Sequence, residues 1–156
     1  MATDPGNEKR SPLRVVLDTN VTIAAHLSKN PHSPTVELLK RWKDKEFVQL
    51  YADGTLAELK EKFAAKRINP QIVEEYIAHL LESGVHVEVT PQDIEPVIPA
   101  DPDDDVIVAC AVVGGATHIV TYDPHFDVLG GEYKGIKIMD GLRFLYYLRG
   151  DKPPVR

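Results

Sequence analysis

Short apolar runs alternate with longer helical segments along this chain, and this alternation limits its fold more than any other feature. Apolar runs rich in β-branched residues stand at 13–17, 47–52, 85–89, 118–121 and 135–139. Segments of about a dozen residues or more separate them, which is long enough for a helical crossover between parallel strands. The pattern therefore predicts an α/β protein, a three-layer α/β/α sandwich with a four- to five-stranded parallel sheet.

Residues that start and stop helices mark the segments between these runs. Pro34 follows Ser33 at a first helical position, Asn69-Pro70 opens another helix, and Gly84 ends it. We predict helices at 21–27, 34–42, 55–68, 70–83, 102–113 and 140–148. Because crossovers between parallel strands are right-handed, the carboxyl ends of the strands should share one edge of the sheet, where such sheets bind ligands.

Composition indicates one compact domain within the 156 residues. We assign residues 13–150 to it, residues 1–12 to a polar N-terminal tail, and residues 151–156 to a C-terminal tail. The chain is 43% hydrophobic, which excludes a disordered protein, and no apolar run reaches the roughly 18 residues of a membrane-spanning helix. The single cysteine, Cys110, excludes an internal disulfide, and no apolar signal segment opens the sequence. We therefore expect a cytoplasmic protein with no membrane partner.

The charge balance argues against a protein that holds nucleic acid by bulk positive charge. Eighteen Lys and Arg residues against 24 Asp and Glu residues give a net charge of −6. Positive charge is concentrated at 40–67, which holds eight basic and five acidic residues. Four basic residues of the predicted helix in this segment form either an ordinary solvated face or a flank for the phosphate backbone of a nucleic acid. They are Lys60, Lys62, Lys66 and Arg67.

Acidic residues follow each of the first four predicted strands. Asp18 comes directly after the first, and Glu58 lies in the first turn of the helix after the second. A run of aspartates at 101–105, interrupted by one proline, opens the helix after the third, and Asp123 lies just past the fourth. All four junctions belong to the carboxyl edge of the predicted sheet, so we expect these acids to converge.

Converging carboxylates repel one another and raise one another's pKa, so such a group needs an offsetting positive charge. A divalent cation supplies it, and Mg²⁺ or Mn²⁺ fits best because the candidate ligands are carboxylates without a His or Cys cluster. A metal of this kind can lower the pKa of a bound water and orient it for in-line attack on a phosphodiester. The chain would then need no nucleophilic side chain, and the sequence offers no obvious one.

Each acidic junction also has a purely structural interpretation. Asp18 could cap the following helix, Glu58 could complete a capping box with Thr55, and the run 101–105 suits a helix N-terminus. Asp123 could belong to a simple turn. Four independent caps would not explain why the most acidic junctions share one edge, so the joint pattern favours a common site.

Three other residues are open to a functional and a structural interpretation. Trp42 could stack against a base, but core or interface packing is the favoured interpretation. Cys110 lies in an apolar helical segment and is predicted to be a small buried side chain. The histidines show no metal-ligand spacing, and among them only His125 lies near the proposed site.

Two segments carry a resemblance to a known family. VVLDTNV at 15–21 and DPDDDVIVACAVVGGATHIVTYDPHF at 101–126 resemble the PIN-domain ribonucleases, and more closely the single-domain toxins of toxin–antitoxin operons, the VapC-like type. The resemblance covers about residues 13 to 148. It places the acidic positions of the family on Asp18, Glu58, Asp105 and Asp123, and its supporting Asn and Thr on Asn20 and Thr121. Because the third position falls in a run of aspartates, Asp103 or Asp104 could share or take the role of Asp105.

This resemblance implies a Mg²⁺- or Mn²⁺-dependent enzyme that cleaves RNA and leaves a 5′ phosphate. It also implies a homodimer or higher oligomer and, for the toxin type, a cognate antitoxin protein encoded nearby. We assign direct or water-mediated ligation of the principal metal to Asp18, Asp105 and Asp123, an assisting or second-ion role to Glu58 and Asp104, and the orientation of the carboxylates to Asn20 and Thr121.

A competing hypothesis is a non-catalytic signalling or scaffold domain of the receiver-like α/β type, which uses an acidic pocket and Mg²⁺. Receiver domains place an acidic pair after the first strand and a phospho-accepting Asp after the third. Here Asp18 stands without such a pair, and Thr90-Pro91 follows the third predicted strand. We therefore favour a metal-dependent endoribonuclease that acts as the toxin of a type II toxin–antitoxin system.

Overall fold

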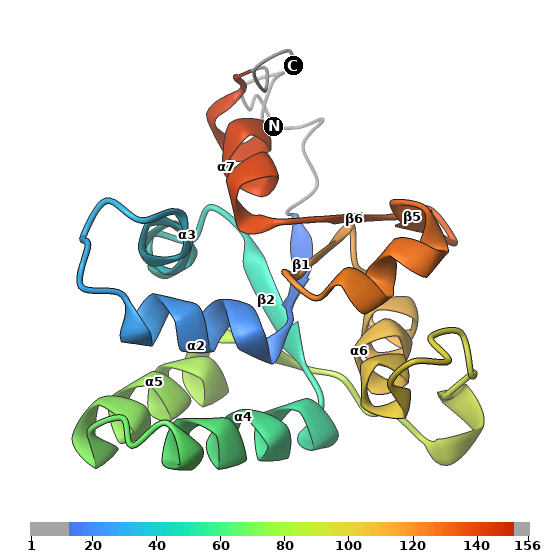
Figure 1. Cartoon of the computed structure of the whole chain (residues 1–156), viewed down its shortest axis with the longest axis horizontal. Helices are drawn as coiled ribbons and strands as arrows, with labels where there is room; N and C mark the ends of the chain where they lie inside the picture. Colours follow the sequence, from blue (N-terminus) through green and yellow to red (C-terminus); the bar gives the residue numbers. More distant parts are fainter. Residues whose placement is uncertain (1–12, 152–156) are drawn as a thin grey trace, which may run out of the picture.

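Six strands form one sheet in the computed structural model, which describes residues 13–151 (Figure 1). The strands are β1 (Arg14–Leu17), β2 (Val48–Tyr51), β3 (Val85–His86), β4 (His118–Val120), β5 (Glu132–Tyr133) and β6 (Ile136–Met139). Their order across the sheet is β3-β2-β1-β4-β6-β5. Every neighbouring pair is parallel except β5 with β6, so the sheet is mostly parallel.

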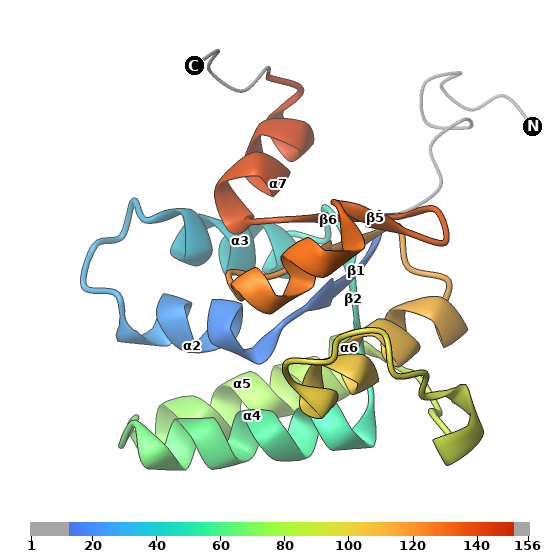
Figure 2. The same cartoon turned by 45° about the vertical axis from the view of Figure 1, so that its right-hand side comes forward.

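Helices cover both faces of this sheet, as the views in Figures 1 and 2 show. The α-helices are α2 (Thr19–Leu27), α3 (Pro34–Lys43), α4 (Asp53–Ala65), α5 (Pro70–Ser83), α6 (Pro102–Val113) and α7 (Gly141–Arg149), and the short 3₁₀ helices are η1 (Pro91–Asp93) and η2 (Pro124–Leu129). Helices α2 to α5 and α7 pack on one face, and α6 packs on the other. The predicted three-layer α/β/α fold is confirmed.

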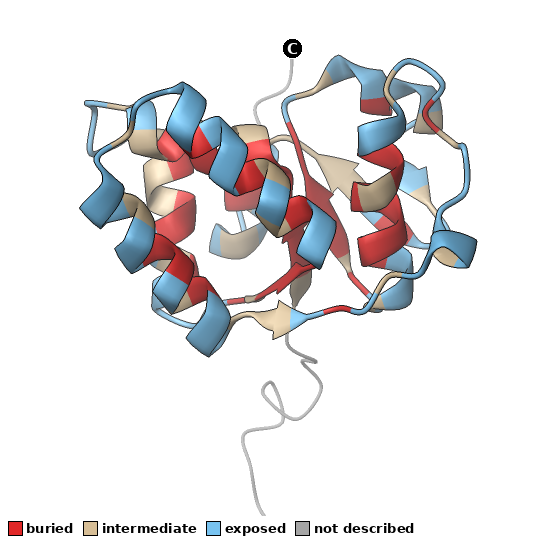
Figure 3. Cartoon of the chain, turned by 90° about the horizontal axis from the view of Figure 1, so that it is seen from below, coloured by how far each residue is buried: buried red, intermediate tan, exposed pale blue. Residues whose placement is uncertain are grey.

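The side chains of β1 alternate between two hydrophobic cores. Val15 and Leu17 belong to the core beneath α2 to α5 and α7, whereas Val16 faces the core that holds Ile107 and Cys110 of α6. Successive residues of a strand point to opposite faces, so a strand buried on both sides must be apolar throughout. Figure 3 shows the result, with buried strands between helices whose outer surfaces are exposed.

The two edges of the sheet differ from the prediction. β3 pairs only through Val85 and His86, and not over 85–89, because the neighbouring strand β2 ends at Tyr51. On the opposite edge, β5 adds an antiparallel strand that the sequence had not indicated. Lys134 and Gly135 join β5 to β6 with positive φ angles of 50° and 83°, as a two-residue hairpin that follows the twist of its strands requires.

Two helices at the carboxyl edge each begin two residues earlier than predicted. Asp18 is itself the N-cap of α2, because its side chain accepts a hydrogen bond from the N–H of Thr19. Ala52 is the N-cap of α4, and the hydroxyl of Thr55 accepts from the N–H of Ala52 at 2.9 Å. The capping box considered for Thr55 and Glu58 is therefore wrong, and the Glu58 side chain has another role.

Every helix within residues 13–151 is too short or too polar to traverse a lipid bilayer. The predicted domain of residues 13–150 falls entirely within this range. The predicted tail at 1–12 lies outside the described residues, as do all but the first residue of the tail predicted at 151–156.

Candidate functional site

The path of the chain across the sheet reverses at β1. From β1 the chain continues to β2 and β3 on one side, and it then crosses to β4 on the other side of β1. At such a switch point the loops that follow the two strands diverge and leave a crevice at the carboxyl ends of the strands. Asp18 follows β1 and Thr121 follows β4, while α4 contacts both α2 and α6 near this edge (Figure 1).

Asp18 is buried at this edge, and both of its carboxylate oxygens accept hydrogen bonds. Oδ1 accepts from the N–H of Thr19 at 2.8 Å, and Oδ2 accepts from the hydroxyl of Thr121 at 2.8 Å. The Thr121 oxygen also accepts from the N–H of Asp123 at 3.0 Å. Burial raises the pKa of Asp18 above its ordinary value, although the hydrogen bond from Thr121 opposes this effect. Thr121 therefore links the two acids that follow β1 and β4.

Asp104, in the first turn of α6, is the carboxylate with the most unfavourable surroundings. Its side chain is 9% exposed, and its Oδ2 has no hydrogen-bond partner within residues 13–151. Burial raises the pKa of Asp104 to about 8, together with the negative charges of Asp18, Asp123 and Asp101. A buried carboxylate in such company is stable only if it binds a proton or receives an offsetting positive charge.

Four potential metal ligands gather around Asp104. Asp101, Asp104, Asp123 and His125 each bring one ligand atom to within 4.8 Å of the others. Nδ1 of His125 lies 3.2 Å from Oδ1 of Asp123 and 3.6 Å from Oδ2 of Asp104, and the second distance is too long for a hydrogen bond. Asp101 is also the N-cap of α6, because its Oδ1 accepts from the N–H of Asp103. The structural interpretation of the run 101–105 as a helix N-terminus is therefore confirmed at Asp101, and this role does not prevent Asp101 from joining the cluster.

Glu58 enters the site from α4 and is held by two other side chains. The hydroxyl of Thr19 donates to Oε1 of Glu58 at 2.7 Å, and Nζ of Lys62 lies 3.1 Å from the same oxygen. Lys62 also donates to Oγ1 of Thr19 at 3.0 Å, so the three side chains form a closed triangle of polar contacts. Partial burial disfavours the charge of Lys62, but the hydrogen bond and charge of Glu58 outweigh it and raise the pKa of Lys62. The charges of Asp18 and Asp104 act in the same direction.

The aspartates on either side of Asp104 do not belong to this cluster. Asp105 is buried, and its Oδ1 accepts from the N–H groups of Val97 at 3.0 Å and Ile98 at 2.8 Å. These bonds fasten the segment before α6 to the helix. Asp103 is exposed. The geometry therefore favours Asp104 as the third acid, and the ligand role of Asp105 stays a prediction.

Asn20 contacts the backbone after β4 and not a carboxylate. Its Oδ1 accepts from the N–H of Tyr122 at 3.4 Å, which is a long hydrogen bond. Tyr122 stands between Thr121 and Asp123. The contact therefore supports the loop that carries these two residues, and any effect of Asn20 on the acids is indirect.

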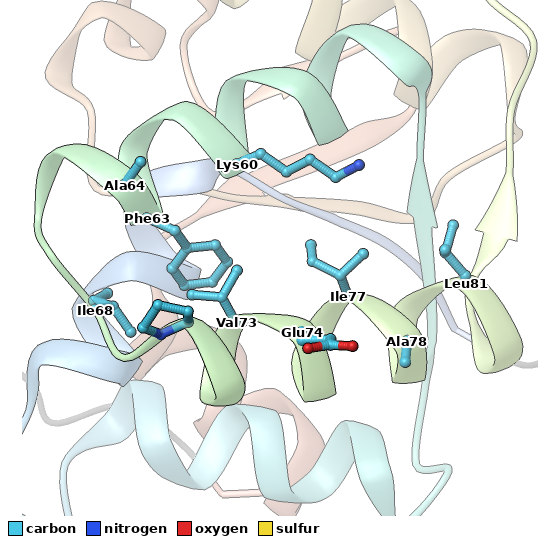
Figure 4. Close-up of a pocket in the computed structure, with 10 residues that line it drawn as sticks. Lys60, Phe63, Ala64, Ile68, Val73, Glu74, Ile77, Ala78 and Leu81 are labelled. Carbon is cyan, nitrogen blue, oxygen red and sulfur yellow. The ribbon is translucent and has the colours of Figure 1, made fainter.

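The basic residues predicted to flank RNA divide between different parts of the surface. Lys62 reaches the acids, and together with Lys66 it also lines a cavity beside α2. Lys60 instead lines an apolar groove of about 480 Å³ between α4 and α5, with Phe63 and Ile77 among the residues below it (Figure 4). Lys60 and Lys62 therefore do not line a common cavity, and contact of these residues and Arg67 with RNA stays a prediction.

Trp42 and Cys110 take no part in the site. Trp42 is 3% exposed and meets the ring of His79 edge-on at a centroid distance of 4.7 Å, so its predicted core role is confirmed and the base-stacking interpretation is wrong. Cys110 is fully buried in α6, as predicted, and burial raises its pKa to about 12.

The sequence had not indicated three of these contacts. Lys62 follows Glu58 by four residues, which places both on one face of a helix, and this spacing could have revealed the pair. Thr19 offered no comparable signal, because its hydroxyl acts on an acid that is 39 residues away in the chain. His125 was close in sequence to Asp123, but only the fold brings it to Asp104.

The donor set fits a hard divalent cation. Carboxylate oxygens dominate it, with one imidazole and no thiolate, since Cys110 is buried elsewhere. The unpartnered Oδ2 of Asp104 is a buried acceptor that a cation would satisfy. A cation held by Asp104 and Asp123 would also offset the repulsion that raises the pKa of Asp104.

Known proteins share the sequence pattern and the fold of this chain. A family model described as the PIN domain matches residues 14–125. The structure of VapBC2 from Rickettsia felis, bound to a DNA fragment from their promoter, is 14% identical with a TM-score of 0.56, over 82% of this chain and 98% of that chain. PAE2754 from Pyrobaculum aerophilum is 17% identical with a TM-score of 0.57, over 90% of this chain and 91% of that chain. Among curated proteins, none matches.

The strand order separates this chain from receiver domains. Their sheet has the order 2-1-3-4-5, in which the first strand lies beside the third. Here β1 lies between β2 and β4, and β3 is at an edge, so the receiver-like alternative is wrong. The family match spans well over half of the sequence and includes Asp18, Glu58, Asp104 and Asp123. The chain therefore belongs to the PIN domain family.

Proposed function

We propose that this protein is an endoribonuclease that hydrolyses RNA phosphodiester bonds with Mg²⁺ or Mn²⁺ as its cofactor. The observation that carries the proposal is the buried, unpartnered Oδ2 of Asp104, which lies among other carboxylates. Burial of such a group in its ionised form destabilises the folded state unless a cation offsets its charge. Membership of the PIN domain family supports a nuclease as the enzyme class.

Each residue of the site would then have a separate role. Asp104 and Asp123 would hold the ion, and Asp18 would contribute its charge from the end of β1. Thr121 fixes the Asp18 carboxylate, and Glu58 extends the acidic surface towards α4. The bound metal would lower the pKa of a water and offset negative charge on the phosphoryl oxygens. Under this proposal Asp105 keeps the loop before α6 in place.

We further propose that the protein is the toxin of a type II toxin–antitoxin system. The VapC-like sequence motifs and the structural likeness to VapBC2 support this assignment. Such a toxin would act on RNA in the cytoplasm as a homodimer or higher oligomer, and a cognate antitoxin protein would bind it. A neighbouring small open reading frame with a DNA-binding N-terminal region would be the expected genetic context.

Cleavage of single-stranded RNA tests the enzymatic proposal. We expect the wild type to release 5′-phosphate products with Mg²⁺ or Mn²⁺, and to release none in EDTA. Asp104→Asn should abolish this activity, whereas the matched control Asp103→Asn, which removes a charge from the exposed neighbour, should retain it. Cleavage in EDTA, or equal activity of the two variants, would contradict the proposal.

A further inference from the structure

Lys62 places a positive charge of the protein itself among the acids of the candidate site. Its ammonium group lies 3.1 Å from Oε1 of Glu58 and 3.0 Å from Oγ1 of Thr19. Lys62 and Glu58 stand one helical turn apart on α4, so a rigid element sets their spacing. Thr19 connects this pair to the first acid of the site, because its N–H donates a hydrogen bond to Oδ1 of Asp18 at 2.8 Å.

The carboxylates of the site therefore fall into two groups that differ in their supply of positive charge. The Glu58 group is already neutralised by Lys62 and satisfied by the hydroxyl of Thr19. The Asp104 group, with Asp123 beside it, has a buried oxygen that no described residue satisfies. Only the second group lacks an offsetting charge of comparable strength.

We propose that Lys62 occupies the place of a second metal ion, so that the site binds a single divalent cation on the Asp104 side. A second ion at Glu58 would have to displace the ammonium group and break its contacts with Glu58 and Thr19. The two positive charges would also repel each other if both remained. This inference rests on the proposed metal-dependent function and narrows it, because it assigns Glu58 to Lys62 and not to a second metal.

Lys62 is a positioning residue in this arrangement. It holds the Glu58 carboxylate against Thr19 and offsets the negative charge of that carboxylate. The negative charges of Glu58, Asp18 and Asp104 attract its ammonium group. A neutral side chain at position 62 would leave Glu58 free to accept a metal ion.

Titration of the full-length protein with Mn²⁺ in the absence of RNA tests this inference, with calorimetry counting the ions bound per chain. We expect one ion for the wild type and two for Lys62→Met, a twofold rise. Lys62→Arg retains the charge and should bind one ion. Lys60→Met removes the same charge from the groove between α4 and α5, and as the matched control it should also bind one.

Each outcome bears on a definite claim. Two ions in the wild type, or a single ion in Lys62→Met, would overturn the role of Lys62 and leave the nuclease proposal standing. Two ions in Lys60→Met would show that any loss of positive charge admits a second ion, which also overturns it. No Mn²⁺ binding by the wild type would instead overturn the metal-dependent function itself.

Discussion

The two ends of β4 each lie beside a buried titratable side chain, and the two side chains differ in kind. At the amino end, His118 is 3% exposed and lies against the rings of Phe144 and Tyr147, at centroid distances of 5.0 and 4.9 Å. Its Nε2 has no hydrogen-bond partner in the described part of the chain, and burial lowers its pKa to about 4. At the carboxyl end, Asp123 faces Asp104, whose pKa is raised to about 8.

The difference shows why one end is suited to packing and the other to a ligand. His118 avoids the cost of burying a charge by remaining neutral, and its aromatic neighbours accept a neutral ring. Protonation of Asp104 removes only one of several negative charges, because Asp18, Asp123 and Asp101 also act on it. A bound cation would relieve the whole group, so the carboxyl end is suited to a cationic partner and the amino end is not.

The largest effect is expected on catalysis, which should depend on the carboxyl end of β4 and not on its amino end. Asp104→Asn should lower kcat/KM for RNA cleavage at least about a hundredfold, because metal-ion charge stabilisation amounts to several kcal/mol and about 1.4 kcal/mol corresponds to tenfold. His118→Gln should stay close to the wild type, since it changes a side chain at the opposite end of the strand. Cleavage rates of a fluorogenic single-stranded RNA measure both, and similar losses in the two variants would remove the distinction.

The carboxylates at the carboxyl end of β4 should make the metal-free protein less stable as the pH rises from about 4 to about 8. In this range the folded state keeps a proton on Asp104, whose pKa is about 8, while the unfolded chain with its value of 3.8 has released it. The free energy of unfolding should therefore fall with rising pH, by up to about 1.4 kcal/mol per pH unit. The raised pKa of Asp18 adds to the same trend.

Urea unfolding in EDTA across this pH range measures the slope of the free energy of unfolding against pH. Asp104→Asn should reduce it, and saturating Mg²⁺ should remove it in the wild type, because the ion binds the ionised carboxylates. An unchanged slope in Asp104→Asn would show that Asp104 is not its source.

His118 should give a smaller effect of opposite sign between about pH 6.5 and 4. Here the unfolded chain binds a proton with a pKa of 6.5, while the folded state does not until about 4. The free energy of unfolding therefore falls as the pH falls, so in the wild type this effect opposes that of Asp104. In urea unfolding of Asp104→Asn, the free energy of unfolding should fall as the pH falls, because only the effect of His118 remains. In His118→Gln it should fall as the pH rises, because only the effect of Asp104 remains. Identical profiles for the two variants would contradict the assignment to opposite ends.

Much of the fold could be predicted because the sheet is buried on both faces. A strand such as β1 must be apolar at every position, so Val15 and Val16 mark it in the sequence without any tertiary information. The hairpin strand β5 has two residues, Glu132 and Tyr133, and neither burial nor alternation distinguishes such a short segment. Its existence depends on the turn at Lys134 and Gly135, which the sequence does not single out.

The position of an acid in the site could be predicted where the acid follows a strand, and less well where it lies on a helix. Asp18 and Asp123 follow buried strands, so topology alone places them at the carboxyl edge. Adjacent residues of a helix point about 100° apart, so the choice between Asp104 and Asp105 depends on how α6 is rotated against the sheet. The resemblance to the PIN-domain ribonucleases placed the third acid on Asp105, whereas in the structure the side chain of Asp104 meets the other acids.

The smallest effect is expected from Asp105→Asn, which tests that choice directly. The amide oxygen can still accept from the N–H groups of Val97 and Ile98, so RNA cleavage and Mn²⁺ binding should stay near the wild type. Asp105→Ala would leave both groups without their acceptor and should lower the free energy of unfolding by about 1–3 kcal/mol. If Asp105→Asn instead abolished cleavage while its unfolding curve stayed unchanged, the ligand would be Asp105, and the unpartnered oxygen of Asp104 would need another explanation.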